Sequence, residues 1–162
     1  MKKRNKKRGI LRTVLLGLVV IASVALAVGL IRGDKTEVDD DGYTTPKLAW
    51  ALGNIDETGA YVESETAIYS SAFELNGGMK IEKEFDSTVN VTVHFYSEIG
   101  EYISSCNSNE LELAEGAFTA RLVVTGQADA EGNLPEIKIY NKASYYRQIT
   151  VKVLAEEVVP AE

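Results

Sequence analysis

The stretch that decides the fold is Val89-Asn90-Val91-Thr92-Val93-His94-Phe95-Tyr96. Apolar and polar side chains alternate along it, and successive side chains of a β-strand point to opposite faces of a sheet. We therefore expect a strand whose buried face is formed by the three valines and Phe95. The other face, with Asn90, Thr92, His94 and Tyr96, is expected to point outward.

Shorter runs of the same kind lie on both sides of this stretch, separated by turns rich in Gly, Asn, Asp and Ser. Asn76-Gly77-Gly78 is a strong hairpin signal between two of the runs, and no stretch of ten residues after Lys47 has a helical pattern. The sequence therefore predicts an all-β domain, a two-sheet sandwich whose finer topology is a jelly roll. The other expected strands are 67–75, 79–85, 101–106, 117–125, 136–142 and 145–155, with weaker ones at 48–52 and 110–113.

The predicted core consists of apolar residues on the inward side of these strands. A domain of this size can bury enough apolar surface without disulfides. The single Cys, Cys106, is accordingly expected to be a buried or half-buried thiol, and the single Trp, Trp50, is expected to close one end of the sandwich. The predicted core residues are Phe73, Leu75, Ile81, Phe85, Val91, Val93, Phe95, Leu122, Val124, Ile137, Ile139, Ile149, Val151 and Val153.

The charges of the 162-residue chain are unevenly distributed. Residues 1–32 contain eight Lys and Arg and no acid, whereas residues 33–162 contain nine bases and all 24 acids, a balance of −15. Such a surface repels phosphate backbones, so we expect no nucleic-acid partner. One His and one Cys exclude a His-rich or multi-cysteine metal site, and Asp39-Asp40-Asp41-Gly42 lacks the spacing of a calcium loop. No metal or cofactor is expected.

An uncharged apolar run extends from Thr13 to Ile31. As a helix of 19 residues it would be roughly 28 Å long, close to the thickness of the hydrocarbon core of a membrane. The basic residues before it predict a cytoplasmic N-terminus and an extracytoplasmic C-terminal part. A cleaved signal peptide is the alternative, with cleavage near Ala27, and would also export the domain.

These features divide the chain into five predicted parts. Residues 1–12 are a basic cytoplasmic segment, 13–31 the transmembrane helix and 32–46 an acidic flexible tether. Residues 47–155 form the extracytoplasmic β-sandwich domain, and 156–162 a short tail.

Two segments of the domain resemble jelly-roll, carbohydrate-binding-like modules of phage tail and Gram-positive surface proteins. Trp50 to Gly59 is similar to their W-x-x-G-x-x-x-x-x-G start, and Phe95 to Ser105 is similar to their F-Y-D-x-x-G-x-F-I-S-S segment, with Ser97 in place of Asp. The resemblance covers roughly residues 48–154. It implies a sandwich used for adhesion or surface recognition, and it assigns no binding residue.

The outward positions of the strands suggest a binding face. Sugars stack on aromatic rings, and amide, hydroxyl and guanidinium groups hydrogen-bond their hydroxyls. We therefore expect recognition of a cell-surface or cell-wall glycan; tyrosines on the outward side of strands are also common strand formers, which is the alternative for these residues. The candidate ligand-binding residues are Tyr96, His94, Asn90, Tyr140, Tyr146, Gln148 and Arg121.

Catalysis is not expected from these residues. His94 lacks a neighbouring acid or nucleophile in the sequence, and Glu63/Glu65 and Glu82/Glu84 each lie on one strand, whereas the two carboxylates of glycosidases normally come from different segments. The alternative function is a non-catalytic protein–protein interaction subunit of an envelope or surface complex, with a partner strand added at a sheet edge.

Overall fold

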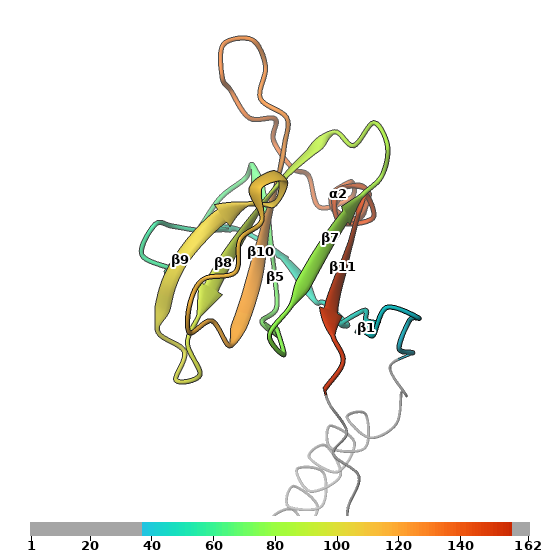
Figure 1. Ribbon diagram of the computed structural model, residues 1–162. Helices are drawn as coiled ribbons and strands as arrows, with labels where there is room; N and C mark the ends of the chain where they lie inside the picture. Colours follow the sequence, from blue (N-terminus) through green and yellow to red (C-terminus); the bar gives the residue numbers. More distant parts are fainter. Residues whose placement is uncertain (1–36, 157–162) are drawn as a thin grey trace, which may run out of the picture. The chain divides into compact units, whose positions relative to one another are not determined.

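The computed structural model describes residues 37–156, which form an all-β unit with three antiparallel sheets (Figure 1). The expected all-β fold is thus confirmed. The expected transmembrane helix at 13–31, the basic segment 1–12 and most of the tail lie outside the described residues. Within residues 37–156, no helix is both long and apolar enough to cross a membrane.

The largest sheet has six strands, and its central pair is β8 (Val89–Tyr96) and β10 (Thr119–Gly126). Strand β9 (Tyr102–Asn107) pairs with β8, and β5 (Ala67–Ser70) pairs with β10 on the other side. Strand β2 (Trp50–Leu52) extends the sheet beyond β5, and β6 (Phe73–Glu74) pairs with the start of β10.

The second sheet has three strands in the order β1 (Tyr43–Thr44), β11 (Ile149–Leu154) and β7 (Met79–Lys83). Figure 1 shows β7 and β11 beside the larger sheet. One apolar cluster joins residues of both sheets, including Val93 and Leu122 from the larger and Val151 from the smaller. The two sheets therefore pack face to face around a common core, a β-sandwich-like arrangement.

The core contains most of the residues predicted from the alternation of inward and outward side chains, including all the inward side chains of β8. Two predictions were wrong: Phe85 and Ile139 are 96% and 77% exposed. β7 ends at Lys83, and a turn closed by Ser87 N–H and Glu84 C=O takes Phe85 out of the sheet. Ile81 is half-buried against the core.

The predicted strands 136–142 and 110–113 do not form. Ile137 is buried, but the chain then turns at Lys138–Asn141 and enters the short helix α2 (Lys142–Tyr146), which also replaces the start of the strand expected at 145–155. Near 110–113 the structure has a 3₁₀ turn, η1 (Ser108–Glu110). The first residues of the expected tether are outside the described part, but Tyr43 and Thr44 pair with β11, so ordered structure begins before the expected boundary at 47.

The Asn76-Gly77 turn has the expected local geometry but a different role. Both residues have positive φ, 47° and 82°, as a type I′ turn requires, and Gly78 N–H bonds Leu75 C=O at 2.9 Å. However, β6 before it pairs with β10, whereas β7 after it pairs with β11. The turn therefore leads the chain from one sheet to the other and does not close a hairpin.

Four tight loops share one construction: a leading Asp or Ser, then two residues, then a Gly with φ between 80° and 87°. The leading side-chain oxygen accepts the backbone N–H of the fifth residue, at 2.8–3.1 Å in all four. Gly adopts this left-handed conformation without steric cost. The loops are Asp39–Tyr43, Asp56–Ala60, Ser97–Glu101 and Asp129–Asn133.

Candidate functional site

The candidate site lies on the face of the six-stranded sheet that points away from the core, here called the outer face. On the central pair the cross-strand partners are Tyr96 with Thr119, His94 with Arg121, Thr92 with Val123 and Asn90 with Thr125. β5 adds Tyr69 opposite Val123, and β9 adds Ser105 opposite His94. The outer face is thus largely polar and aromatic, in contrast to the apolar inner face.

A small hairpin covers the middle of this face. It consists of β3 (Asn54–Ile55), β4 (Tyr61–Val62) and the intervening Asp56–Ala60 loop, called the 56–60 loop below. Ile55 is buried in a small apolar cluster with Ala67 and Val123 of the sheet. Tyr61 packs its ring against Tyr69, with 5.2 Å between centroids. These contacts attach the hairpin to the outer face.

Two tyrosines of the sheet hold the 56–60 loop. The Tyr96 hydroxyl donates a hydrogen bond to Gly59 C=O at 3.2 Å, and Tyr102 meets the Tyr96 ring edge-on at 5.7 Å. A Cβ on Gly59 would lie 2.6 Å from the Tyr102 side chain. The close approach of the loop to Tyr102 therefore requires the absence of a side chain at position 59.

On one side of the hairpin lies a half-open hollow of about 470 Å³, called the Arg121 hollow. Tyr61, Tyr69 and Tyr96 line it together with Arg121 and Thr119. The Arg121 guanidinium is held by a long bond of 3.4 Å from Nη1 to Ser70 C=O, which leaves most of its five donors for other partners. Aromatic faces and a cation thus converge on one space.

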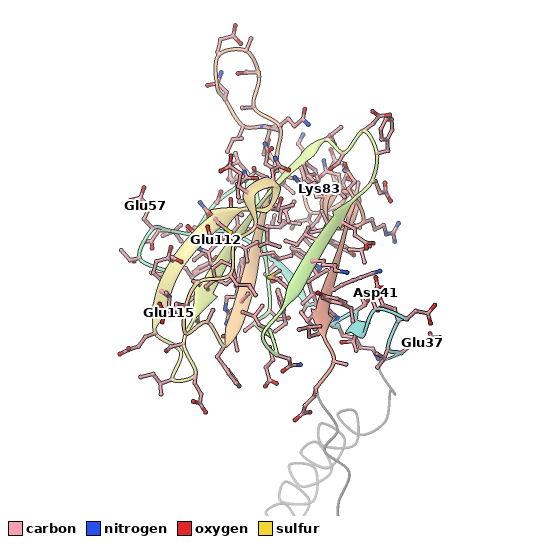
Figure 2. All side chains as sticks on the ribbon, in the orientation of Figure 1. Glu37, Asp41, Glu57, Lys83, Glu112 and Glu115 are labelled. Atoms are coloured by element: carbon pink, nitrogen blue, oxygen red, sulfur yellow. The ribbon has the colours of Figure 1, made fainter. Side chains whose placement is uncertain are left out.

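On the other side lies a second hollow of about 660 Å³, called the His94 hollow. Its floor is formed by Thr92, His94 and Thr125 of the sheet, and its border by Asp56 and Thr58 of the 56–60 loop. Figure 2 shows Glu57, on the same loop, directed away from the sheet. Ile55 lines both hollows, so the two spaces adjoin along the hairpin.

The electrostatics of the site follow from burial and from the loop. Burial lowers the pKa of His94 below its ordinary 6.5, although the nearby Asp56 carboxylate raises it. Burial also raises the pKa of Tyr96, against the opposing effect of Arg121. Hydrogen bonds from the side chain and backbone of Thr58 lower the pKa of Asp56. At neutral pH the site therefore contains a neutral imidazole, an ionised Asp56 and a protonated Tyr96.

Four of the predicted binding residues lie together on the outer face: Tyr96, His94, Asn90 and Arg121. His94 differs from expectation in one respect, since it is only 4% exposed. The expectation of an exposed side chain assumed an open sheet face, whereas the hairpin covers it.

The other three predicted residues lie elsewhere, because the segments that contain them are not the expected strands. Tyr140 is 81% exposed in the turn before α2. Tyr146, in α2, stacks on Trp50 with 5.6 Å between centroids and an interplanar angle of 9°. The Gln148 side-chain oxygen accepts the backbone N–H of Thr88 at 2.7 Å, and its amide donates to Ser144 C=O. Gln148 therefore links the β7–β8 connection to α2 by hydrogen bonds.

Sequence reasoning missed Tyr61 and Tyr69. Tyr69 could have been predicted to point outward, because it follows the buried Ile68 in a run already expected to be a strand. Tyr61 offered no such signal, since its strand is two residues long and follows a loop.

Among residues 37–156, no cluster of three or more His, Cys, Asp or Glu could hold a metal ion. No protein-family model, no curated protein and no solved structure matches the chain.

Proposed function

We propose that the protein is a membrane-anchored, extracytoplasmic binding module that recognises cell-surface or cell-wall glycan through the outer face. In this proposal residues 13–31 anchor the chain, and the two packed sheets form a jelly roll like that of the modules it resembles. The module binds its ligand without chemical conversion and without a metal or cofactor.

The observation that supports this function most is the convergence of Tyr61, Tyr69, Tyr96 and Arg121 on the Arg121 hollow. Tyrosine rings offer apolar faces to the C–H side of a sugar and hydroxyls to its polar edge. The guanidinium offers a fork of donors that suits sugar hydroxyls and carboxylates. Tyr61 is 55% exposed, so a ligand can reach it without movement of the hairpin.

Co-sedimentation of the detergent-solubilised full chain with isolated cell walls tests this function. We expect retention by walls, and a loss of retention in Tyr61→Ala and Arg121→Gln. Tyr140→Ala is the matched control, because it removes an exposed tyrosine outside the outer face. Absence of retention of the unmodified chain, before and after removal of wall-attached polymers, contradicts the glycan proposal.

A second candidate function, the non-catalytic subunit of an envelope complex, is favoured by a different observation. Phe85 and Tyr140 are large, highly exposed side chains in the β7–β8 and β10–α2 connections. Both connections lie at the end of the domain opposite to β1 (Figure 1). Phe85→Ser would then abolish co-purification of an envelope protein while wall retention stays unchanged.

A further inference from the structure

The hydroxyl groups of the His94 hollow form a cluster of their own. Thr92, Thr125 and Ser105 line it from three neighbouring strands, β8, β10 and β9. Within residues 37–156 these three hydroxyls make no hydrogen bond to another side chain or to the backbone. A set of convergent donors and acceptors without protein partners suits a ligand that has several hydroxyls of its own.

His94 adds a second, independent indication. It lines the same hollow, its side chain is more than nine-tenths buried, and its Nδ1 has no hydrogen-bond partner in the described part of the chain. Leaving a buried polar atom unpaired is costly in the free protein. Because Nδ1 is closed off from solvent in the free protein, a ligand hydroxyl pairs with it only after a local shift of the residues around the hollow.

The two hollows differ in charge. Arg121 provides a cation on one side of the hairpin, whereas Asp56 and Glu57 border the His94 hollow. An acidic group is therefore favoured in the Arg121 hollow and repelled from the His94 hollow. His94 and Arg121 are direct cross-strand partners, whose Cβ atoms lie about 5 Å apart in such pairs. The two hollows also share Ile55 in their lining, so adjacent units of one extended ligand can occupy both.

We propose that the His94 hollow is a second subsite that binds an uncharged, hydroxylated sugar, next to an acid-bearing sugar in the Arg121 hollow. The ligand class is then a glycan in which an acid-bearing sugar alternates with a neutral one. This inference rests on the proposed function, since it names the ligand of the same face. Ile55 and the 56–60 loop separate the two subsites.

The test uses N-acetylglucosaminyl-N-acetylmuramic acid as a disaccharide probe, and each of its two sugars alone, with calorimetric titration of the full chain. The variant is Thr92→Val/Thr125→Val, which replaces two hydroxyls by methyl groups in strands where Val is well tolerated. At about a factor of five for each lost hydrogen bond, we expect at least a tenfold lower affinity for the disaccharide. Affinity for N-acetylmuramic acid alone should stay unchanged. Thr150→Val, at an exposed position of β11, is the matched control.

Two results would overturn the inference, and they differ in what else they contradict. If the double variant binds the disaccharide like the unmodified chain, while Arg121→Gln weakens binding, the second subsite is wrong and the glycan function stands. If the unmodified chain binds none of the three probes, both the subsite and this ligand class are wrong. Wall retention then decides separately whether the glycan function survives.

Discussion

Replacement of Gly59 by Ala should destabilise the protein far more than the same change in an equivalent loop. Gly59 has φ +80°, and a Cβ there would lie 2.6 Å from the Tyr102 side chain. Gly132 occupies the same position of the Asp129–Asn133 loop with φ +87°, but nothing lies within 4 Å of its Cβ position. The two glycines therefore share the conformational cost and differ in the steric one.

The expected magnitudes follow from this difference. A left-handed alanine costs roughly 1 kcal/mol, so Gly132→Ala should lower the free energy of unfolding by about that amount. Forcing a Cβ against the Tyr102 ring adds an overpacking cost of about 1–3 kcal/mol, so Gly59→Ala should lose roughly 2–4 kcal/mol. The added cost should also displace the 56–60 loop and weaken glycan binding.

Urea denaturation of the full chain, followed by Trp50 fluorescence, measures both variants. Trp50 is the single Trp and packs against the main core, so its emission reports unfolding of the domain. The Gly59→Ala/Tyr102→Gly double variant is a further control, because it removes the Tyr102 Cβ, Cγ and Cδ2 atoms, which would all lie 2.6 Å from the new methyl group. Equal destabilisation by Gly59→Ala and Gly132→Ala would show that the close approach of Gly59 to Tyr102 adds no steric cost.

Three further predictions concern the core, the buried imidazole and Gln148, which lies away from the outer face. Leu122→Ala, at a fully buried position, should cost about 2–5 kcal/mol of unfolding free energy; a loss below 1 kcal/mol would contradict the assigned core. Because burial lowers the pKa of His94, the unfolded chain binds a proton at higher pH than the folded one. The free energy of unfolding should thus fall as pH drops below about 6.5. His94→Gln removes the single His and should abolish this pH dependence between pH 5 and 7. A pH dependence that persists in His94→Gln would contradict its assignment to His94. Gln148→Ala should lower the free energy of unfolding by about 1–2 kcal/mol while wall retention stays unchanged. A loss of wall retention would indicate that Gln148 contributes to ligand binding.

The alternating pattern of β8 predicted the central strand correctly, because a strand with one buried face imposes a two-residue period on its side chains. The alternation gave a wrong prediction at Phe85, which lies just past the end of β7, and at Ile139, which lies in a segment that forms no strand. A turn at Glu84–Ser87 and another at Lys138–Asn141 end the segments first. The alternation of apolar and polar residues cannot show where a strand stops pairing with its neighbours.

The candidate site was predicted only in part, for a related reason. The alternation along β8 predicted that Tyr96, His94 and Asn90 share one face. The pairing of β10 with β8 places Arg121 on the same face. The hairpin that covers this face depends on contacts of Ile55 with residues far along the chain. Such contacts leave no periodic signal in a two-residue strand, so the burial of His94 was not predictable.

Hydrogen–deuterium exchange of the full chain, with and without solubilised cell-wall glycan, tests the central claim most directly. Glycan should slow amide exchange in residues 54–62 and around His94 and Arg121, which border the two hollows. Exchange in the connections that contain Phe85 and Tyr140 should not change. Slower exchange confined to those two connections, or no change anywhere, would contradict the assignment of the outer face as a glycan-binding site.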